Sequence, residues 1–585
     1  MAERFAVGID LGTSTSEVAV YQRGGVHVVP DWKTKSPIIP SVIGVDKHGV
    51  MQVGQDALSQ LRQLRGTQEI KRLMGTDARI ELDGKEYAPE ELSAVLLTYL
   101  KRNAEEFIGE KVTDVVISVP ANFSEPRRRA TTRAAELAGL NVVRIVNEPT
   151  AAALAFGYMN TGVEGQIAVF DFGGGTLDVS VLEMMEGVLE VKATYGDVEL
   201  GGKDFDDALI GLIEGKLYAE YPGAEIGAKS SRGLKLLVQT VKMALSSSTS
   251  ADVNMPFFAQ HAGQPVDLDV TIERDEFEKA IEPLLNRARV CVQTALAAKG
   301  FRPEHIDQVL LVGGTTYIPA VRRLVSEAFG REPETGVSPD LAVAMGTALR
   351  AAAANDMLGE DAPVLADVCS FGLGTDILLP GQAEPSYDPL IAPNTPVPFS
   401  ASRSYSLVDT EQSSLNLMLI QSHDGLARYI KDAVIVRTER IANIPASRSG
   451  QPHTVNVEFS YDVDGLSRLR AIIVETGQQA EIRHALVGDE STGAMGSRVT
   501  VGGAVANMGG PSGMKPVQDA GGEPWRSHPH AAQYEPILER SSAYSADPQV
   551  ANLIGQLQHA LSVRDDAHVD QIADALTDRV FDLST

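Results

Sequence analysis

The sequence predicts a mixed α/β region, then an antiparallel β domain, then a short helical segment. Three observations predict this order. Through about residue 350, short apolar runs alternate with amphipathic stretches, as in α/β folds. After residue 360, apolar residues alternate with a period of two, which is typical of antiparallel strands. The stretch 545–583 returns to helical spacing and suggests a pair of helices.

Composition and charge limit the class of protein. At 585 residues the chain is expected to divide into two to four domains. Its net charge of −27 does not favour binding to nucleic acid or to a membrane surface. It has only two cysteines, Cys291 and Cys369, which fits a reducing compartment. A strand pattern begins at once and no apolar stretch is long enough to span a bilayer, so we expect a cytoplasmic protein.

The α/β region contains clear strand and helix patterns. Strands are predicted at 112–120, 142–146 and 307–314, where short apolar runs are bounded by turn residues. Helices are predicted at 125–139 and 322–330, and each pattern closes on a glycine, as helix C-termini prefer. Strands and helices therefore alternate along this part of the chain.

The later part of the chain has a different sequence pattern. Residues 362–368 (APVLADV) are typical of a short linker. Strands with period-two alternation follow at 413–421 and 454–465. Residues 488–530 are rich in Gly, Pro and Ser and predict a flexible linker.

A strand that ends in aspartate and a glycine turn occurs twice. Residues 5–20 read FAVGIDLGTSTSEVAV, and residues 167–181 read IAVFDFGGGTLDVSV. The backbone N–H groups of such a turn form a concavity for phosphate oxygens, and the aspartate suits a hydrated Mg²⁺. One copy alone is often only a tight hairpin. Two copies predict two similar lobes that hold one nucleoside triphosphate between them.

The chain also resembles a known family. Its motifs are similar to those of the actin-like ATPase superfamily and, within it, of the seventy-kilodalton heat-shock proteins (DnaK-type molecular chaperones). The motifs that carry the resemblance are IDLGTSTSEVAV (9–20), IKRLMG (70–75), VPANF (119–123), RIVNEPTAAALAFG (144–157), VFDFGGGTLDVSV (169–181), LGGKDFD (200–206) and VLLVGGTTYIP (309–319).

The resemblance implies a domain organisation. It implies a two-lobed, actin-like ATPase domain at 1–360 and an interdomain linker at 361–368. It implies a β-sandwich that binds substrate at 369–487. The Gly/Pro-rich linker at 488–530 then leads to a short helical segment at 531–585, which the resemblance implies is a reduced lid.

The resemblance also implies catalytic roles. Asp10 and Asp171 flank Mg²⁺ and the attacking water, Lys71 reaches the γ-phosphate, and Glu148 orders metal-bound water and joins the Mg²⁺ site. A solvated lysine and an exposed loop glutamate are the alternatives for Lys71 and Glu148. Thr176 is implied to be a further catalytic residue, and Asp178 completes the polar cluster with it. The remaining residues implied to line the ATP or ADP site are Gly12, Thr13, Ser14, Gly173, Gly174, Gly175, Gln239, Lys242, Met243, Ser246, Gly313, Gly314, Tyr317 and Asp340.

Three positions on the adenine side depart from the family pattern. Gln239 stands where the family has glutamate, and Met243 and Tyr317 stand where it has arginines that sandwich the base. Tyrosine can still stack on adenine, and methionine adapts its shape to aromatic rings. We therefore expect ATP to bind, but more weakly and with faster exchange than in ordinary members.

The resemblance places a peptide pocket in the β domain. Its implied residues are Thr375, Leu378, Val408, Leu415 and Leu417. Strand alternation supports a shared face for Leu415 and Leu417, with Asn416 and Met418 on the other. The alternative is that this shared face is simply the core of the sandwich.

Coupling between the domains is the last feature that the resemblance implies. The residues concerned are Pro120 and Arg128 in the ATPase domain and Leu365 and Asp367 in the linker. The linker has one leucine fewer than the family's usual run.

The leading functional hypothesis is an ATP-dependent chaperone that binds and releases extended apolar segments of unfolded proteins. A J-domain co-chaperone and a nucleotide-exchange factor are the expected partners, and a monomer is the expected state. A second hypothesis is a nucleotide-switched, peptide-binding scaffold with little or no ATP turnover. A third is a sugar or glycerol kinase on the same scaffold, which would leave the β domain unexplained.

Overall fold

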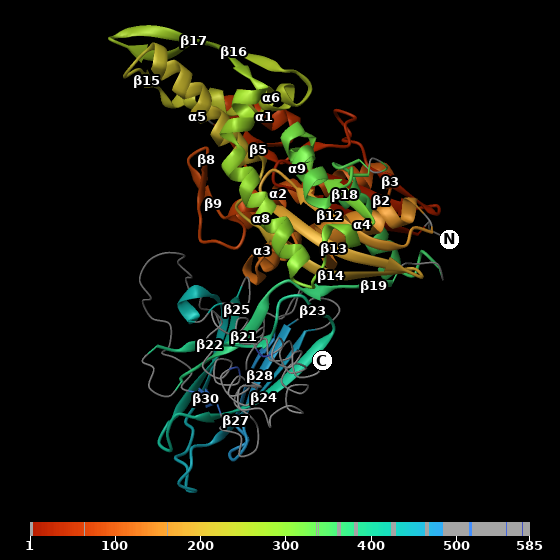
Figure 1. Cartoon of the computed structure of the whole chain (residues 1–585), viewed down its shortest axis with the longest axis vertical. Helices are drawn as coiled ribbons and strands as arrows, with labels where there is room; N and C mark the ends of the chain where they lie inside the picture. Colours follow the sequence, from red (N-terminus) through yellow and green to blue (C-terminus); the bar gives the residue numbers. More distant parts are fainter. Residues whose placement is uncertain are drawn as a thin grey trace.

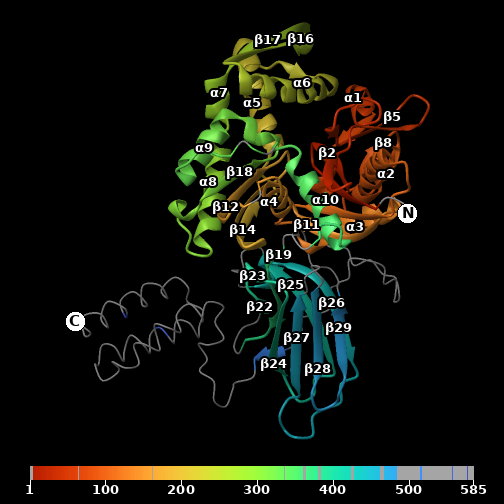
Figure 2. The ribbon, with the colours of Figure 1, turned by 90° about the vertical axis from the view of Figure 1, so that its right-hand side faces the viewer.

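The structure is a computed structural model. It describes residues 4–63, 65–160, 162–334, 336, 338–359, 364–379, 384–422, 427, 429–461, 467–483 and 514–516, together with Leu557 and Leu576. Figure 1 shows an α/β part above a β part. Figure 2, turned by 90°, shows that the α/β part consists of two lobes side by side.

Each lobe is built on a mixed sheet, and four neighbouring strands have the same arrangement in both sheets. The strands of the first sheet are, in spatial order, β11 (Asn141–Asn147), β10 (Asp114–Val119), β1 (Phe5–Leu11), β2 (Thr15–Gln22) and β3 (Gly25–Val28), with β4 (Ile39–Pro40) beside β2. Those of the second sheet are β18 (Gln308–Val312), β12 (Gly165–Phe172), β13 (Leu177–Met185), β14 (Val188–Asp197) and β19 (Val364–Ala366). β1 pairs in parallel with β10 and antiparallel with β2, just as β12 pairs with β18 and β13. The repeated sequence motif therefore corresponds to a repeated strand–turn–strand unit.

Helices cover both faces of these sheets. The helices of the two sheets are α2 (Pro89–Ile108) and α3 (Glu125–Leu137) in the first lobe, α5 (Gly202–Glu220), α8 (Glu282–Ala297) and α9 (Pro319–Phe329) in the second, and α4 (Glu148–Met159) and α10 (Ala342–Ala354) between them. Val7 and Ile9 of β1 pack with α2, whereas Ala6 faces a cluster that also contains Leu154 of α4 and Leu349 of α10. This second cluster includes Val169 of β12, so α4 and α10 join the two lobes through one core.

Each lobe carries a smaller extension beyond its sheet. That of the first lobe contains β5 (Val42–Val45), β6 (Met51–Val53), α1 (Gln55–Arg62), β7 (Gly66–Gln68), η1 (Ile70–Leu73), β8 (Ile80–Leu82) and β9 (Lys85–Tyr87). That of the second contains β15 (Glu225–Ile226), α6 (Ala228–Ser247), β16 (Ser250–His261), β17 (Gln264–Glu273) and α7 (Arg274–Ala280). The β16–β17 hairpin lies at the far end of the molecule (Figure 1). Leu58 of α1 and Leu236 of α6 pack on one small cluster, so the extensions meet across the cleft.

The β part is a sandwich of two antiparallel sheets. One sheet contains β22 (Ser386–Ile391), β21 (Gly372–Ile377), β25 (Ser414–Ser422) and β26 (Val434–Ala442). The other contains β29 (Gln479–Arg483), β28 (Ser467–Ile473), β27 (Thr454–Tyr461), β24 (Phe399–Leu407) and β30 (Met514–Pro516). β20 (Val368–Cys369) and β23 (Thr395–Pro396) form a short ladder beside them. Side chains from both sheets, such as Leu415 and Val455, fill the core between them.

The structure confirms the mixed α/β region and the β region that follows it. The strands predicted at 112–120, 142–146 and 307–314 are β10, β11 and β18, and the helices predicted at 125–139 and 322–330 are α3 and the greater part of α9. α9 ends at Gly330, which adopts a left-handed conformation (φ 64°) that only glycine takes without strain.

The C-terminal predictions are mostly outside the described residues. This holds for the linker at 488–530, except Met514–Pro516, and for the helical segment at 531–585, except Leu557 and Leu576. Met514–Pro516 differs from the prediction, since it forms a strand with Met514 fully buried in the sandwich core. In the described part of the chain, no helix combines the length and hydropathy needed to cross a bilayer.

Candidate functional site

The two glycine turns, one from each lobe, lie against each other. Gly174 and Gly175 of the second turn lie so close to the first that a side chain would not fit. A Cβ on Gly174 would lie 2.0 Å from the Oγ of Ser14, and one on Gly175 would lie 2.6 Å from the Oγ1 of Thr13. The structure thus brings the two turns, predicted from motifs far apart in the sequence, into one site.

Hydrogen bonds fix the shape of both turns. The Oγ of Ser16 accepts a bond from the Gly12 N–H (3.1 Å), and Ser41 donates to the Gly12 carbonyl (2.9 Å). In the second turn the N–H of Gly173 donates to the carbonyl of Thr176, a buried residue (3.0 Å). Anchored turns of this kind hold their remaining N–H groups in place for an anion.

Asp10 and Asp171 stand at equivalent places, near the ends of β1 and β12. Both are buried. Asp10 accepts a hydrogen bond from Ser118 (2.7 Å), whereas the Oδ2 of Asp171 has no hydrogen-bond partner among the described residues. Burial raises the pKa of Asp10, and burial followed by the nearby carboxylate of Glu148 raises the pKa of Asp171 well above its ordinary value. The site therefore concentrates negative charge away from solvent.

Lys71 and Glu148 form a buried ion pair beside these carboxylates. Lys71 lies in η1 and Glu148 is the first residue of α4, and their Nζ and Oε1 atoms are 2.5 Å apart. Burial alone would lower the pKa of Lys71, but the charges of Glu148 and Asp10 raise it. Burial raises the pKa of Glu148 to about 7. The alternatives of a solvated lysine and an exposed glutamate do not hold, because both side chains are buried.

Several residues that the sequence did not single out, among them Asn122 and Arg72, complete this region. Asp178 accepts hydrogen bonds from the side chain of Asn122 (2.6 Å) and from the N–H of Ala121 (3.2 Å), and burial raises its pKa. Arg72 donates to the carbonyl of Gly175 (3.0 Å) and pairs with Asp204 of α5 (2.6 Å), which links the two lobes. The position of Arg72 directly after Lys71 in IKRLMG was the available signal.

The residues predicted for the nucleoside lie on α6 and near the second turn. Lys242 pairs with Asp206 (2.8 Å) and donates to the carbonyl of Gly202 (2.7 Å). Ser246 donates a hydrogen bond to the carbonyl of Lys242 (3.3 Å). Gln239 lies one helical turn before Lys242 and is half-buried. Met243 is 72% exposed. Lys242 is therefore fixed, whereas Met243 projects into solvent.

The turn after β18 supplies the other predicted nucleoside residues. Gly313 adopts a left-handed φ of 81°, and a Cβ there would lie 2.5 Å from the carbonyl oxygen of Phe172. This contact places the turn against the end of β12, and Gly314 follows next to Asp340. Tyr317 donates a hydrogen bond to Asp340 (2.9 Å) and its ring is 41% exposed. The ring is therefore oriented yet accessible.

Replacing Tyr317 by alanine is expected to weaken ADP binding. Stacking of a base on an aromatic side chain contributes about 1–3 kcal/mol, which corresponds to roughly 5- to 150-fold in affinity. Tyr317→Phe keeps the ring and loses the hydrogen bonds of the hydroxyl to Asp340 and Ser338, so its effect is expected to be small. Titration calorimetry with ADP measures both, with Tyr218→Ala as a control at an equally exposed tyrosine (41%) on α5. An unchanged affinity in Tyr317→Ala would show that the ring does not contact the base.

The predicted peptide-pocket residues fall into two groups. Thr375, Leu415 and Leu417 are fully buried, and the two leucines belong to the sandwich core. Leu378 and Val408 are half-buried near the edge of the sandwich, where Leu378 N–H donates to Met514 and Val408 N–H donates to Gln412. Leu415 and Leu417 do share a face, and Met418 packs on the other face with Tyr387. A role in peptide binding stays a prediction, since core packing accounts for the leucines.

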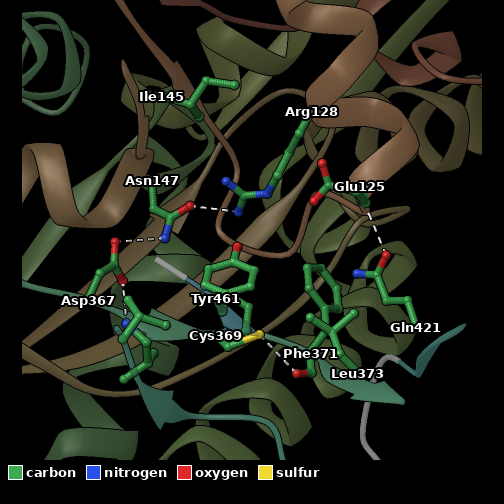
Figure 3. A pocket seen from close by; sticks show the side chains of 13 residues that line it. Glu125, Arg128, Ile145, Asn147, Asp367, Cys369, Phe371, Leu373, Gln421 and Tyr461 are labelled. Carbon is green, nitrogen blue, oxygen red and sulfur yellow. Dashed lines mark hydrogen bonds between the residues drawn. The ribbon is translucent and has the colours of Figure 1, made fainter. Parts of the chain in front are cut away.

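The predicted linker docks on the second lobe as a strand. β19 pairs in parallel with β14, with Leu365 opposite Leu189. Directly after it, Asp367 accepts a hydrogen bond from the side chain of Asn147 (3.1 Å), and Arg128 donates to the Oδ1 of the same asparagine (2.7 Å). Figure 3 shows this chain of polar groups from the linker to α3. Pro120 is buried, immediately before Ala121, whose carbonyl also accepts a bond from Arg128 (3.0 Å).

The β-sandwich makes further contacts with the α/β part. Gln421 of β25 accepts a hydrogen bond from the N–H of Glu125 (3.1 Å), as Figure 3 shows, and Asn394 accepts one from the N–H of Thr194 on β14 (2.8 Å). Glu125 and Gln421 line a small cavity between the two parts. Both hydrogen bonds join residues far apart in the sequence, so only the folded chain could reveal these contacts.

Comparison with known proteins identifies similar chains. A family model described as Hsp70 protein matches residues 6–494. The chaperone protein DnaK of Thermotoga petrophila is 37% identical over 505 residues, which cover 84% of this chain and 83% of the relative. That of Thermosipho africanus is 35% identical over 502 residues, which cover 83% of this chain and 82% of the relative. The similarity thus extends over both the α/β part and the β-sandwich.

Proposed function

This chain belongs to the Hsp70 family and is an ATP-dependent chaperone, and we propose that it binds and hydrolyses ATP between the two facing glycine turns. The observation that carries this proposal is the contact of Gly174 and Gly175 with Ser14 and Thr13 beside the buried Lys71–Glu148 pair. Phosphoryl transfer depends on positioned donors and on charge neutralisation more than on covalent help. Facing turns with a buried cation beside them supply both.

The two turns would hold the phosphates, one turn from each lobe. Backbone N–H groups in glycine turns approach phosphate oxygens without side-chain interference. On the nucleoside side, the fixed Lys242 and the accessible ring of Tyr317 are the groups available to the ribose and the base. Closure of the lobes around one nucleotide is therefore the role proposed for the duplicated motif.

The carboxylates fit a hydrated Mg²⁺. Asp10, Asp171 and Glu148 would hold it, and the Oδ2 of Asp171 has no other partner among the described residues. In the part of the chain that the structure describes, no three acidic, histidine or cysteine side chains converge as direct metal ligands. Mg²⁺ keeps several waters and takes few protein carboxylates, so these side chains would contact it mostly through water. When bound, the ion neutralises charge on the phosphates.

The protein residues would act on the γ-phosphate as follows. Lys71 places a positive charge where negative charge develops on the transferring phosphoryl group. Asp171 orients the attacking water through its free Oδ2. The bond from the water oxygen to the γ-phosphorus forms as the bond from that phosphorus to the β–γ bridging oxygen breaks. ADP then leaves with the electron pair of the broken bond, and a proton of the attacking water passes to an oxygen of the released phosphate.

The proposal extends to clients and partners. The clients are unfolded polypeptides, and we place their extended apolar segments on the β-sandwich, near Thr375, Leu378, Val408, Leu415 and Leu417. A J-domain co-chaperone and a nucleotide-exchange factor are the proposed partners, with a monomer as the working unit in the cytoplasm. The segment division made from the sequence, with an ATPase domain at 1–360 and a sandwich from 369, is part of the same proposal. Nothing observed favours a scaffold without turnover, and family membership does not support a sugar kinase.

Equilibrium binding of ADP and ATP to the full chain tests the proposed site. Calorimetry in Mg²⁺ is expected to give one nucleotide per chain, with the two nucleotides in competition. Hydrolysis of the bound ATP to ADP and phosphate is expected to follow. A chain that binds neither nucleotide would contradict the assignment of this cleft.

Asp367→Ala is expected to uncouple peptide release from ATP. The carboxylate of Asp367 holds the docked linker against Asn147, and hydrogen bonds to charged groups contribute about 1.5–3 kcal/mol. Without it the docked linker is weakened, so ATP should no longer accelerate release of a fluorescent apolar peptide. Stopped-flow anisotropy measures that rate. Nucleotide affinity is expected to stay within about threefold, since a threefold change is below 1 kcal/mol.

A matched control is available on the sandwich itself. Glu458→Ala also removes one carboxylate, but from an exposed position on β27. It should release peptide in response to ATP as the unmodified chain does. If Asp367→Ala behaved like Glu458→Ala, the docked linker would not be the coupling element.

A further inference from the structure

The duplicated motif contains a second carboxylate in each copy. In the first copy Glu17 follows Asp10 by seven residues, and in the second Asp178 follows Asp171 by the same interval. In the structure Asp10 lies directly opposite Glu17 on the paired strands β1 and β2. Asp171 lies directly opposite Asp178 on β12 and β13. Glu17 is therefore the first-lobe counterpart of Asp178.

The carboxylates of Asp178 and Glu17 differ in the hydrogen bonds that they accept. Asp178 accepts hydrogen bonds from Asn122 and from the N–H of Ala121. Glu17 is 1% exposed, and its Oε1 has no hydrogen-bond partner among the described residues. The side chain of Glu17 forms a hydrogen bond with the side chain of Thr15. A buried carboxylate oxygen without a donor is unfavourable, so this atom is suited to a ligand that brings a donor or a positive charge.

The charged groups around Glu17 indicate whether that ligand is a cation or an anion. Directly opposite pairs on antiparallel strands point their side chains to the same face, so Glu17 and Asp10 lie on one face of the sheet. Asp171 and Glu148 add further carboxylates to this buried region, and Lys71 is already paired with Glu148. An anion such as phosphate would be repelled by Glu17, whereas a hydrated divalent cation brings both charge and O–H donors.

We propose that Glu17 is a positioning residue for the nucleotide's divalent cation, with its free Oε1 accepting a hydrogen bond from the cation's water shell beside Asp10. This inference rests on the proposed function, because it requires a nucleotide and its cation in this cleft. It adds a residue to the site that neither the motifs nor their resemblance implied. The alternative is a buried carboxylate with a purely structural role, held by Thr15.

The experiment compares ADP binding to the full chain with Mg²⁺ and with EDTA. For each variant, the dissociation constant in EDTA is divided by the dissociation constant in Mg²⁺. This ratio reports how much the cation contributes to affinity. Glu17→Gln keeps the size of the side chain and removes its charge. The ratio is expected to fall about five- to tenfold in this variant, and affinity in EDTA is expected to stay the same or to improve. A purely structural role would change both dissociation constants alike and leave the ratio untouched, which would overturn the inference.

Two further variants and one baseline complete the design. Glu86→Gln removes a charge of the same kind from an exposed position on β9 and should keep the unmodified ratio. Glu17→Asp retains the charge and is expected to recover most of the ratio. Thermal melting without nucleotide is expected to show that Glu17→Gln is no less stable than the unmodified chain. If the unmodified chain itself showed no effect of Mg²⁺ on ADP affinity, the proposed Mg²⁺–nucleotide site would fail, independently of Glu17.

Discussion

Lys71→Ala is expected to reduce single-turnover ATP hydrolysis about 10²- to 10³-fold, which is the usual effect of removing one positioned charge-stabilising donor. Lys71 is buried next to Asp10 and Glu148, and it is the cation of this carboxylate cluster. Quenched-flow measurement of phosphate from a stoichiometric ATP complex gives the rate. ADP binding is expected to persist, because the two turns are unchanged.

Controls separate a catalytic loss from a folding defect. Lys111→Ala truncates a lysine whose side chain is 91% exposed, and it should hydrolyse ATP at the unmodified rate. Removing one partner of a buried ion pair destabilises a fold by about 3–5 kcal/mol, so Lys71→Ala must be checked by thermal melting. The double variant Lys71→Ala with Glu148→Gln also removes the charge of the ion-pair partner and is expected to be folded and inactive. Hydrolysis within threefold of the unmodified rate in either variant would remove Lys71 from the mechanism.

Gly175→Ala is expected to abolish nucleotide binding at concentrations where the unmodified chain is saturated. A Cβ at this position would lie 2.6 Å from the Oγ1 and 2.9 Å from the Cγ2 of Thr13. Because threonine is branched at Cβ, rotation of its side chain cannot clear both contacts. The two turns must therefore separate, and each would lose its position on the phosphates. Calorimetry with ADP measures the loss.

A second substitution tests the cause of that loss. Thr13→Ala removes both colliding atoms and leaves only a Cβ contact of 3.1 Å, so the double variant is expected to recover part of the affinity. Gly211→Ala is the control, since a Cβ there meets nothing within 4 Å and alanine favours the helix α5. Normal ADP binding by Gly175→Ala would show that the closed arrangement of the turns is not the binding arrangement.

Much of the proposed nucleotide site could be predicted because its motifs are encoded locally. Each copy of the motif contains its own strand, aspartate and turn, so Asp10 and Asp171 were predictable from the repeat alone. The seven-residue interval could also have indicated Glu17 as the counterpart of Asp178, but that signal is visible only when the two copies are compared position by position. Its burial and its unpartnered oxygen required the structure.

Other features depend on contacts between distant segments, which no local pattern encodes. The linker pattern at 362–368 gave no sign that Val364–Ala366 would pair in parallel with β14, because that ladder joins residues far apart in the sequence. The same holds for the bond between Gln421 and Glu125 and for the pair between Arg72 and Asp204. Period-two alternation correctly placed Leu415 and Leu417 on one face, but it cannot separate a sandwich core from a peptide pocket.

The central claim is that ATP turnover in the α/β part is coupled to peptide binding on the β-sandwich. Single-turnover ATP hydrolysis by the full chain, with and without an extended apolar peptide, tests it most directly. Slow hydrolysis that the peptide accelerates is the predicted result, because the docked linker connects the two parts. ATP that binds but is not hydrolysed, or is hydrolysed at one rate whether or not peptide is present, would contradict the claim.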